Sequence, residues 1–169
     1  MEQIYHAHWE NVFDAAFKRI GCEDVAQDIT QEIFISLWEN RENLNIEGQL
    51  GAYLYGAVKF RVINHFKSLS IKDGHQAELA LLMNQQRYAA ADSNLILHDL
   101  NIEVDAAIAQ LPEKMRQVIS MSRKQEKSIK EISGELNISV QTVKNQITAA
   151  MKLLKKNLSY ILFLAFLIH

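Results

Sequence analysis

Apolar residues recur every three or four positions along most of this chain, a spacing typical of amphipathic helices. The pattern predicts helices over residues 4–20, 25–38 and 50–69. Nearer the C-terminus, two more helices are predicted between residues 127 and 156, with a turn of three residues between them. Because alternating polar and apolar runs are rare and the chain contains a single proline, the sequence predicts an all-α fold.

The turn is Asn137-Ile138-Ser139. Asn137 tolerates the left-handed backbone of a tight turn, and Ser139 can cap the second helix by accepting a hydrogen bond from its free N–H groups. The inner face of the second helix is apolar, whereas its outer face offers groups suited to base edges and phosphates. The candidate DNA-binding residues are Ser139, Gln141, Thr142, Lys144, Asn145, Thr148 and Lys152. An ordinary helical hairpin needs the same turn and cap, so both interpretations stay open at this point.

Positive charge is concentrated around this hairpin. Residues 111–169 hold ten basic and four acidic residues, although the whole chain has a net charge of −2. Residues 48–72 form a second basic block, with four basic residues and no acid, while 1–47 and 73–110 are acidic. Neutralised phosphates release counterions and so supply sequence-independent affinity for DNA. The charge distribution therefore favours DNA binding.

The helix predicted over 50–69 combines basic and aromatic side chains. Its polar and aromatic residues are Tyr53, Tyr55, Lys59, Phe60, Arg61, Asn64, His65 and Lys67. Aromatic rings beside cations are used to stack and hold the bases of single-stranded nucleic acid. The alternative is that these rings pack in the core, as most aromatic residues do in a helix this apolar.

The composition limits the function classes. A hydrophobic fraction of 49% over 169 residues is enough for one domain or two small ones. Cys22 is the only cysteine, so no intramolecular disulfide can form, and no zinc-binding spacing occurs. With no secretory signal at the start, these features predict a cytoplasmic protein. No nucleophile elbow or phosphate-binding glycine loop is present, so we expect no catalytic residues, no metal or cofactor and no small-molecule substrate.

The chain ends in an apolar tail, residues 158–169. As a helix, Leu158 to Ile168 would span about 16 Å, roughly half of a membrane's hydrocarbon core. The tail is therefore too short to cross a membrane unaided. It could dock on the protein's own helices and sequester the DNA-reading part, bind a partner protein, or associate shallowly with a membrane surface.

Residues 26–38, AQDITQEIFISLW, resemble conserved region 2 of bacterial sigma factors of the sigma-70 family, extracytoplasmic-function (ECF) type. The spacing D-x-x-Q-E-x-F-x-x-x-W of that region is kept. In the family this helix binds a coiled coil on the β′ subunit of core RNA polymerase. The resemblance therefore implies core RNA polymerase as a partner, bound through Asp28, Gln31, Glu32, Phe34 and Trp38.

The next helix, residues 53–67, is similar to the family segment that melts and reads the promoter −10 element. The resemblance implies that Lys59, Arg61, Asn64, His65 and Lys67 lie near DNA. Leu111-Pro112-Glu113-Lys114 and the hairpin that follows resemble region 4, which binds the −35 element in the major groove. The same resemblance places region 4 near the β flap of the polymerase.

The resemblance divides the chain into a region 2 helical bundle at 1–70, a flexible linker at 71–94, a region 4 helix-turn-helix at 95–157 and the tail at 158–169. It implies a cytoplasmic sigma factor, not an enzyme, that directs core polymerase to promoter DNA. An anti-sigma factor is a further partner known in the family, and a membrane-bound one would hold the chain near the membrane. The alternative is a helix-turn-helix transcriptional regulator that acts without polymerase and has no use for the region 2 motif.

Overall fold

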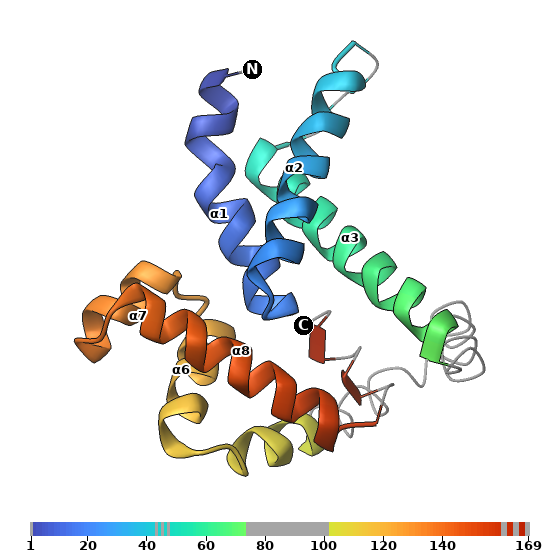
Figure 1. The fold of residues 1–169 in the computed structure, drawn as a ribbon. Helices are drawn as coiled ribbons and strands as arrows, with labels where there is room; N and C mark the ends of the chain where they lie inside the picture. The colour runs from blue at the N-terminus through green and yellow to red at the C-terminus, as the bar shows by residue number, and fades with distance from the viewer. Residues whose placement is uncertain are drawn as a thin grey trace.

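The computed structural model describes residues 2–42, 44, 46, 48–73, 102–159, 162–163 and 166–167. Its regular elements are helices, so the all-α prediction is confirmed for this part of the chain (Figure 1). The helices are α1 (Glu2–Ile20), α2 (Glu23–Glu39), α3 (Leu50–Asp73), α6 (Glu113–Arg123), α7 (Ile129–Leu136) and α8 (Val140–Asn157). Residues 102–109 are also helical.

The first bundle consists of α1, α2 and α3, each of which contacts the other two. The apolar stripe Ile29, Ile33 and Leu37 of α2 is buried, as its spacing of four residues predicted. Leu54 and Val58 of α3 are buried as well. Each helix turns its apolar face inward, so the core of this bundle follows from periodicity alone.

The second bundle consists of α6, α7 and α8 and contains the predicted hairpin. Asn137 ends α7 in the left-handed conformation, with φ 50° and ψ 46°. The Oγ of Ser139 accepts a hydrogen bond from the Thr142 N–H at 3.0 Å and so caps α8. The turn at 137–139 is therefore confirmed residue by residue.

The two bundles pack against each other where the end of α1 meets α8 (Figure 1). Gly21, which follows α1, has a φ of 69° that favours glycine. A Cβ atom on Gly21 would lie only 2.8 Å from the Cβ of Met151 in α8. The absence of a side chain at this position thus permits the contact between the bundles.

The described part of the C-terminal tail docks on the protein's own helices, as the first interpretation of the tail expected. The ring of Phe163 lies 5.3 Å from that of Phe66 in α3. The carbonyl oxygen of Leu167 accepts a hydrogen bond from the Nε of Arg19 in α1 at 3.1 Å. The tail therefore contacts the first bundle directly. Among the described residues, no helix is long and apolar enough to cross a membrane.

The helix predicted to end at residue 69 continues to Asp73, so the first three residues of the predicted linker are helical. Residues 70–73 contain neither glycine nor proline, and the next glycine along the sequence is Gly74. The rest of the predicted linker, 74–94, and the predicted start of the second module at 95 lie outside the described residues.

The packing of the tail predicts a measurable effect on stability. Phe163→Ala should lower the free energy of unfolding by about 3 to 5 kcal/mol, because it replaces a buried ring with a cavity. Urea denaturation followed by circular dichroism measures the change. Phe60→Ala is the matched control, since that ring is 63% exposed and its loss should cost less than about 0.5 kcal/mol. Equal effects of the two substitutions would contradict the docking of the tail.

Candidate nucleic-acid interface

Most of the predicted DNA-binding residues of α8 lie on one accessible face. Five of them are exposed: Ser139, Gln141, Asn145, Thr148 and Lys152. Thr142 is half-buried beside the Ser139 hydroxyl. The side-chain amide of Gln141 donates a hydrogen bond to the Oδ1 of Asn145 at 3.0 Å, which orients both amides along the helix. Amide and hydroxyl groups in this arrangement can bond to base edges and phosphates.

Lys144 differs from the other predicted residues because it lies in the contact between the bundles. Its side chain is 17% exposed, and its Nζ is 2.6 Å from the Oε1 of Glu23 in α2. The same ammonium group lies 5.0 Å from the ring centre of Phe13 in α1. The placement of Lys144 among the outward-facing residues was therefore wrong for this arrangement. Periodicity along α8 could not show that the other bundle covers this edge of the helix.

Three polar contacts join α1 to the start of α7 beside this point. The Oδ2 of Asp14 accepts a hydrogen bond from the backbone N–H of Ile129 at 3.0 Å, and Lys18 donates to the carbonyl oxygen of Lys127. Glu10 pairs with Lys130 at 2.6 Å. Burial is the main reason that the pKa of Asp14 is raised and that of Lys18 lowered. Burial disfavours the charged forms of both side chains, so the cost of desolvation offsets part of the attraction in this contact.

The second predicted DNA surface lies on α3, and its aromatic residues are exposed. Tyr53, Tyr55 and Phe60 are 37%, 41% and 63% exposed, so the interpretation that they pack in the core was wrong. Tyr53 and Phe60 help to line a groove of about 480 Å³ between α2 and α3. Lys59 lies over the Tyr55 ring, with its Nζ 5.3 Å from the ring centre. Aromatic faces beside cations are thus available to unpaired bases.

The remaining predicted residues of α3 are partly engaged within the protein. The guanidinium group of Arg61 pairs with the Glu32 carboxylate of α2 at 2.6 Å, which joins a predicted DNA contact to a predicted polymerase contact. His65 is half-buried, and burial together with the charge of Lys155 lowers its pKa. Asn64 and Lys67 are also half-buried. These residues lie towards the end of α3 that is near the second bundle.

The predicted polymerase surface on α2 is exposed except at one residue. Asp28, Gln31 and Glu32 are exposed, and Trp38 is 49% exposed with the guanidinium group of Arg41 4.1 Å from its ring centre. Phe34 is buried, and Trp9 and Tyr5 of α1 lie against its ring. The spacing of four residues between Phe34 and Trp38 did not show that α1 covers only the first of them. Phe34 therefore packs between α1 and α2 and helps to hold the two helices together.

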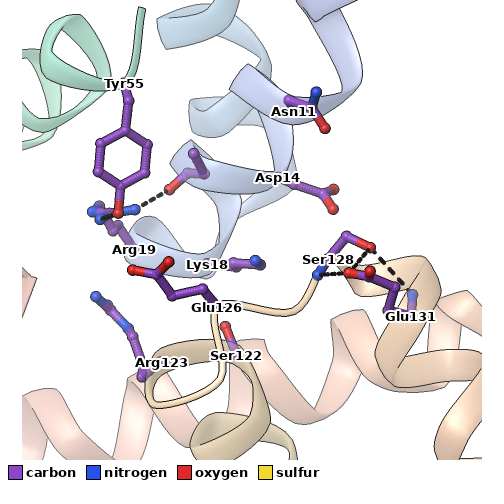
Figure 2. Close-up of a pocket in the computed structure, with 11 residues that line it drawn as sticks. Asn11, Asp14, Lys18, Arg19, Tyr55, Ser122, Arg123, Glu126, Ser128 and Glu131 are labelled. Carbon is purple, nitrogen blue, oxygen red and sulfur yellow. Dashed lines mark hydrogen bonds between the residues drawn. The ribbon is translucent and has the colours of Figure 1, made fainter. Parts of the chain in front are cut away.

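A cluster of charged groups that the sequence did not predict lies between the bundles (Figure 2). Arg19 of α1 is buried and donates hydrogen bonds to the carbonyl oxygen of Ala15 and the hydroxyl of Tyr55. Arg123, the last residue of α6, extends towards it, and its three guanidinium nitrogens are buried with no hydrogen-bond partner. Burial and the charge of Arg19 lower the pKa of Arg123 to about 9. No local sequence signal could have brought these two arginines together, because they are far apart in the chain.

No group of histidine, cysteine or carboxylate side chains that could hold a metal ion occurs among the residues that the structure describes. The site is therefore built from hydrogen-bonding, cationic and aromatic side chains. Such groups can bind nucleic acid and protein surfaces.

Comparisons with known proteins agree with this division into two bundles. The family model "Sigma-70 region 2" matches residues 4–70, and "Sigma-70, region 4" matches residues 101–154. The chain is 28% identical over 162 residues to the ECF RNA polymerase sigma factor SigW of Bacillus subtilis, covering 92% of this chain and 87% of SigW. It is 26% identical over 150 residues to the ECF RNA polymerase sigma factor SigE of Mycolicibacterium smegmatis, covering 86% of this chain and 56% of SigE.

Among solved structures, the chain is similar to the sigma factor RpoE of Bartonella quintana, which was crystallised with the anti-sigma factor NepR. The identity is 16%, the TM-score is 0.37, and the match covers 92% of this chain and 94% of RpoE.

The charge pairs across the bundle contact predict an effect on the shape of the molecule. Glu10→Lys combined with Glu23→Lys should increase the radius of gyration above the roughly 15 Å expected for a compact chain of this length. The two changes place lysines against Lys130 and Lys144, so attraction becomes repulsion. Small-angle X-ray scattering at low salt measures the radius.

The matched control is Asp24→Lys combined with Glu39→Lys, which changes the net charge equally. Neither residue forms an ion pair within the described part of the chain. An unchanged radius in the Glu10→Lys, Glu23→Lys variant would contradict a role for these pairs in joining the bundles.

Proposed function

The chain is a sigma factor of the sigma-70 family, ECF type, and we propose that its two bundles divide promoter recognition between them. It binds core RNA polymerase and directs transcription initiation from specific promoters, and it has no catalytic activity of its own. A helix-turn-helix regulator that acts without polymerase is not favoured, because residues 4–70 match region 2. The division of labour rests on one observation: the two bundles present different exposed surfaces, a polar face on α8 and an aromatic groove beside α3.

In this proposal α8 binds the −35 element in the major groove. Gln141, Asn145 and Thr148 face outward and can reach base edges, while Lys152 is placed for a phosphate. The Ser139 cap and the N-terminus of α8 add backbone N–H groups that suit a phosphate oxygen. Lys144 becomes available for DNA only when Glu23 releases it.

The −10 element binds along α3 in the same proposal. Phe60 and Tyr53 border the groove between α2 and α3, and unpaired bases can stack on their exposed faces. Lys59 and Asn64 provide nearby hydrogen-bond donors. Arg61 forms an ion pair with Glu32 of α2, which orients both side chains. The pair lies where the proposed DNA surface meets the proposed polymerase surface.

Core polymerase binds the outer surface of α2 through Asp28, Gln31, Glu32 and Trp38. Trp38 is the anchor of this surface, because a half-exposed indole can be fully buried by a partner and such residues dominate binding energies. Acidic side chains around it repel DNA and favour a basic protein partner. We expect the chain to act in the cytoplasm with the polymerase, and an anti-sigma factor is a further partner that the family resemblance implies.

Binding both promoter elements requires the bundles to separate. In the sigma-70 family the two regions span about two turns of DNA, roughly 70 Å, whereas a compact chain of this length is about 40 Å across. The part of the predicted linker that follows α3, residues 74–94, could reach roughly 70 Å if fully extended. The packed arrangement therefore corresponds to the chain before promoter binding, with Lys144 and the end of α3 in the contact.

The division of labour predicts opposite effects of two substitutions. Asn145→Ala should lower promoter-directed initiation about 5- to 100-fold, because one bidentate base contact is worth about 1 to 3 kcal/mol. It should leave polymerase binding unchanged. Trp38→Ala should weaken polymerase binding about 30-fold or more, as expected when an interface anchor is truncated. In vitro transcription and polymerase affinity, measured on the same preparations, test both.

Lys156→Ala provides the control for α8, because this exposed lysine lies near the end of the helix, away from the proposed base contacts. Asp24→Ala provides the control for α2, since Asp24 is exposed at the end of the same helix far from Trp38. If Asn145→Ala left promoter choice untouched, the role assigned to α8 would be wrong.

A further inference from the structure

The cluster between the bundles encloses a cavity of about 470 Å³ (Figure 2). Lys18, Arg19 and Tyr55 of the first bundle line it on one side, and Ser122 and Arg123 of the second bundle line it on the other. A cavity of this size is in the range of small-molecule sites in proteins. Neither promoter recognition nor polymerase binding accounts for it.

Arg123 is the least satisfied group in this cavity. Its Nε and both terminal nitrogens are shielded from solvent and have no hydrogen-bond partner. One face of the guanidinium group lies over the ring of Phe166, with 4.2 Å from the Cζ to the ring centre. An aromatic ring stabilises the charge but accepts no conventional hydrogen bond, so the N–H groups of Arg123 lack an acceptor.

The neighbouring groups are also donors. Arg19 uses one hydrogen of each nitrogen, to Leu167, Ala15 and Tyr55, so two N–H groups remain on its terminal nitrogens. The Tyr55 hydroxyl accepts the bond from Arg19 and keeps its own proton to donate. The ammonium group of Lys18 uses one hydrogen for the carbonyl oxygen of Lys127. Arg19, Tyr55 and Lys18 thus keep several N–H and O–H donors that these hydrogen bonds do not use.

Three carboxylates line the cavity, Asp14, Glu126 and Glu131, and two of them are bonded to other groups. Glu126 forms no ion pair within the described residues. Glu131 accepts bonds from the backbone N–H and hydroxyl of Ser128, as part of the capping box of α7. Asp14 accepts the N–H of Ile129. Within the described residues, no carboxylate lies within ion-pair distance of Arg123 or Arg19. Neither arginine therefore has a direct ion-pair partner in the described chain, although the Glu126 carboxylate lines the same cavity.

We propose that this cavity binds a small phosphoryl anion, with Arg123 and Arg19 holding the phosphate oxygens and Tyr55 and Lys18 adding donors at the side. Phosphoryl groups match the site because each supplies several acceptor oxygens and the planar guanidinium fork of Arg123 can bind two of them at once. The site excludes a nucleic-acid strand, since the guanidinium of Arg123 is buried.

The ligand groups come from both bundles, so binding also favours the packed arrangement. An anion that bridges Arg19 and Arg123 replaces like-charge repulsion with two attractive contacts, and the bundles must stay together to make both. A bound anion would thereby oppose the opening that promoter binding requires. This consequence rests on the proposed function, whereas binding of the anion does not.

Binding can be tested on the purified full-length chain without polymerase. Inorganic pyrophosphate and ADP are titrated at constant ionic strength, with citrate as a carboxylate anion of similar charge. At a hundred times the dissociation constant, the phosphoryl ligand should raise the Tm by about 5 to 10 °C. Isothermal titration calorimetry gives the affinity. Tighter binding of pyrophosphate would identify a free phosphate compound as the ligand type, and tighter binding of ADP would identify a nucleotide.

Arg123→Met should weaken binding at least tenfold, and without ligand it should be as stable as the unchanged chain or more stable, because a buried unpaired charge is removed. Arg116→Met is the matched control, since Arg116 lies on the same helix but is exposed and bonded to Ala109; its response should be unchanged. If Arg123→Met fails to fold, Tyr55→Phe, which removes one donor, should weaken binding instead.

Three outcomes would overturn the proposal: no stabilisation of the unchanged chain by either phosphoryl ligand, an equal response in the Arg123→Met variant, or an equal response to citrate. A failed promoter assay with intact anion binding would instead count against the proposed function alone.

Discussion

The close approach of α1 and α8 at Gly21 and Met151 is the constraint on which the arrangement of both bundles depends. A residue with a Cβ at position 21 would come within 2.8 Å of the Met151 side chain and would also be strained at a φ of 69°. Once the helices meet at this point, Lys144 lies against Glu23 and Phe13, and Asp14 reaches the start of α7. The apolar tail then covers the far end of the same contact through Phe163.

The contact between the bundles is suited to separate. The ion pair of Glu10 with Lys130 lies at the surface, where solvent screens it and it contributes little. The buried polar groups of the contact are only partly satisfied, as the guanidinium of Arg123 shows. The helices of each bundle pack mainly among themselves, with Val58 buried in one bundle and Ile147 in the other, so the proposed opening need not unfold either. The proposed binding of both promoter elements requires this property.

The two proposed promoter-binding surfaces differ in how the contact between the bundles affects them. The outward face of α8 keeps Gln141 and Asn145 accessible, while Lys144 beside them is held by the other bundle. Along α3, Phe60 stays exposed, but His65 lies near Lys155 of α8, close enough for that charge to lower its pKa. The contact between the bundles therefore covers charged groups of the proposed DNA surfaces, whereas it leaves the proposed base-reading side chains exposed.

The sequence by itself determined the helices and the turn at 137–139, because periodicity, the left-handed tolerance of Asn137 and the cap at Ser139 act between near neighbours in the chain. It also determined the family, through the spacing of residues 26–38 and of the hairpin. Only the tertiary structure decided that Phe34 is covered by α1 while Trp38 is exposed, that Lys144 faces Glu23, and that Arg19 meets Arg123. Those outcomes depend on which helix lies across a given face, and contacts between residues on different helices leave no periodic signal in the sequence.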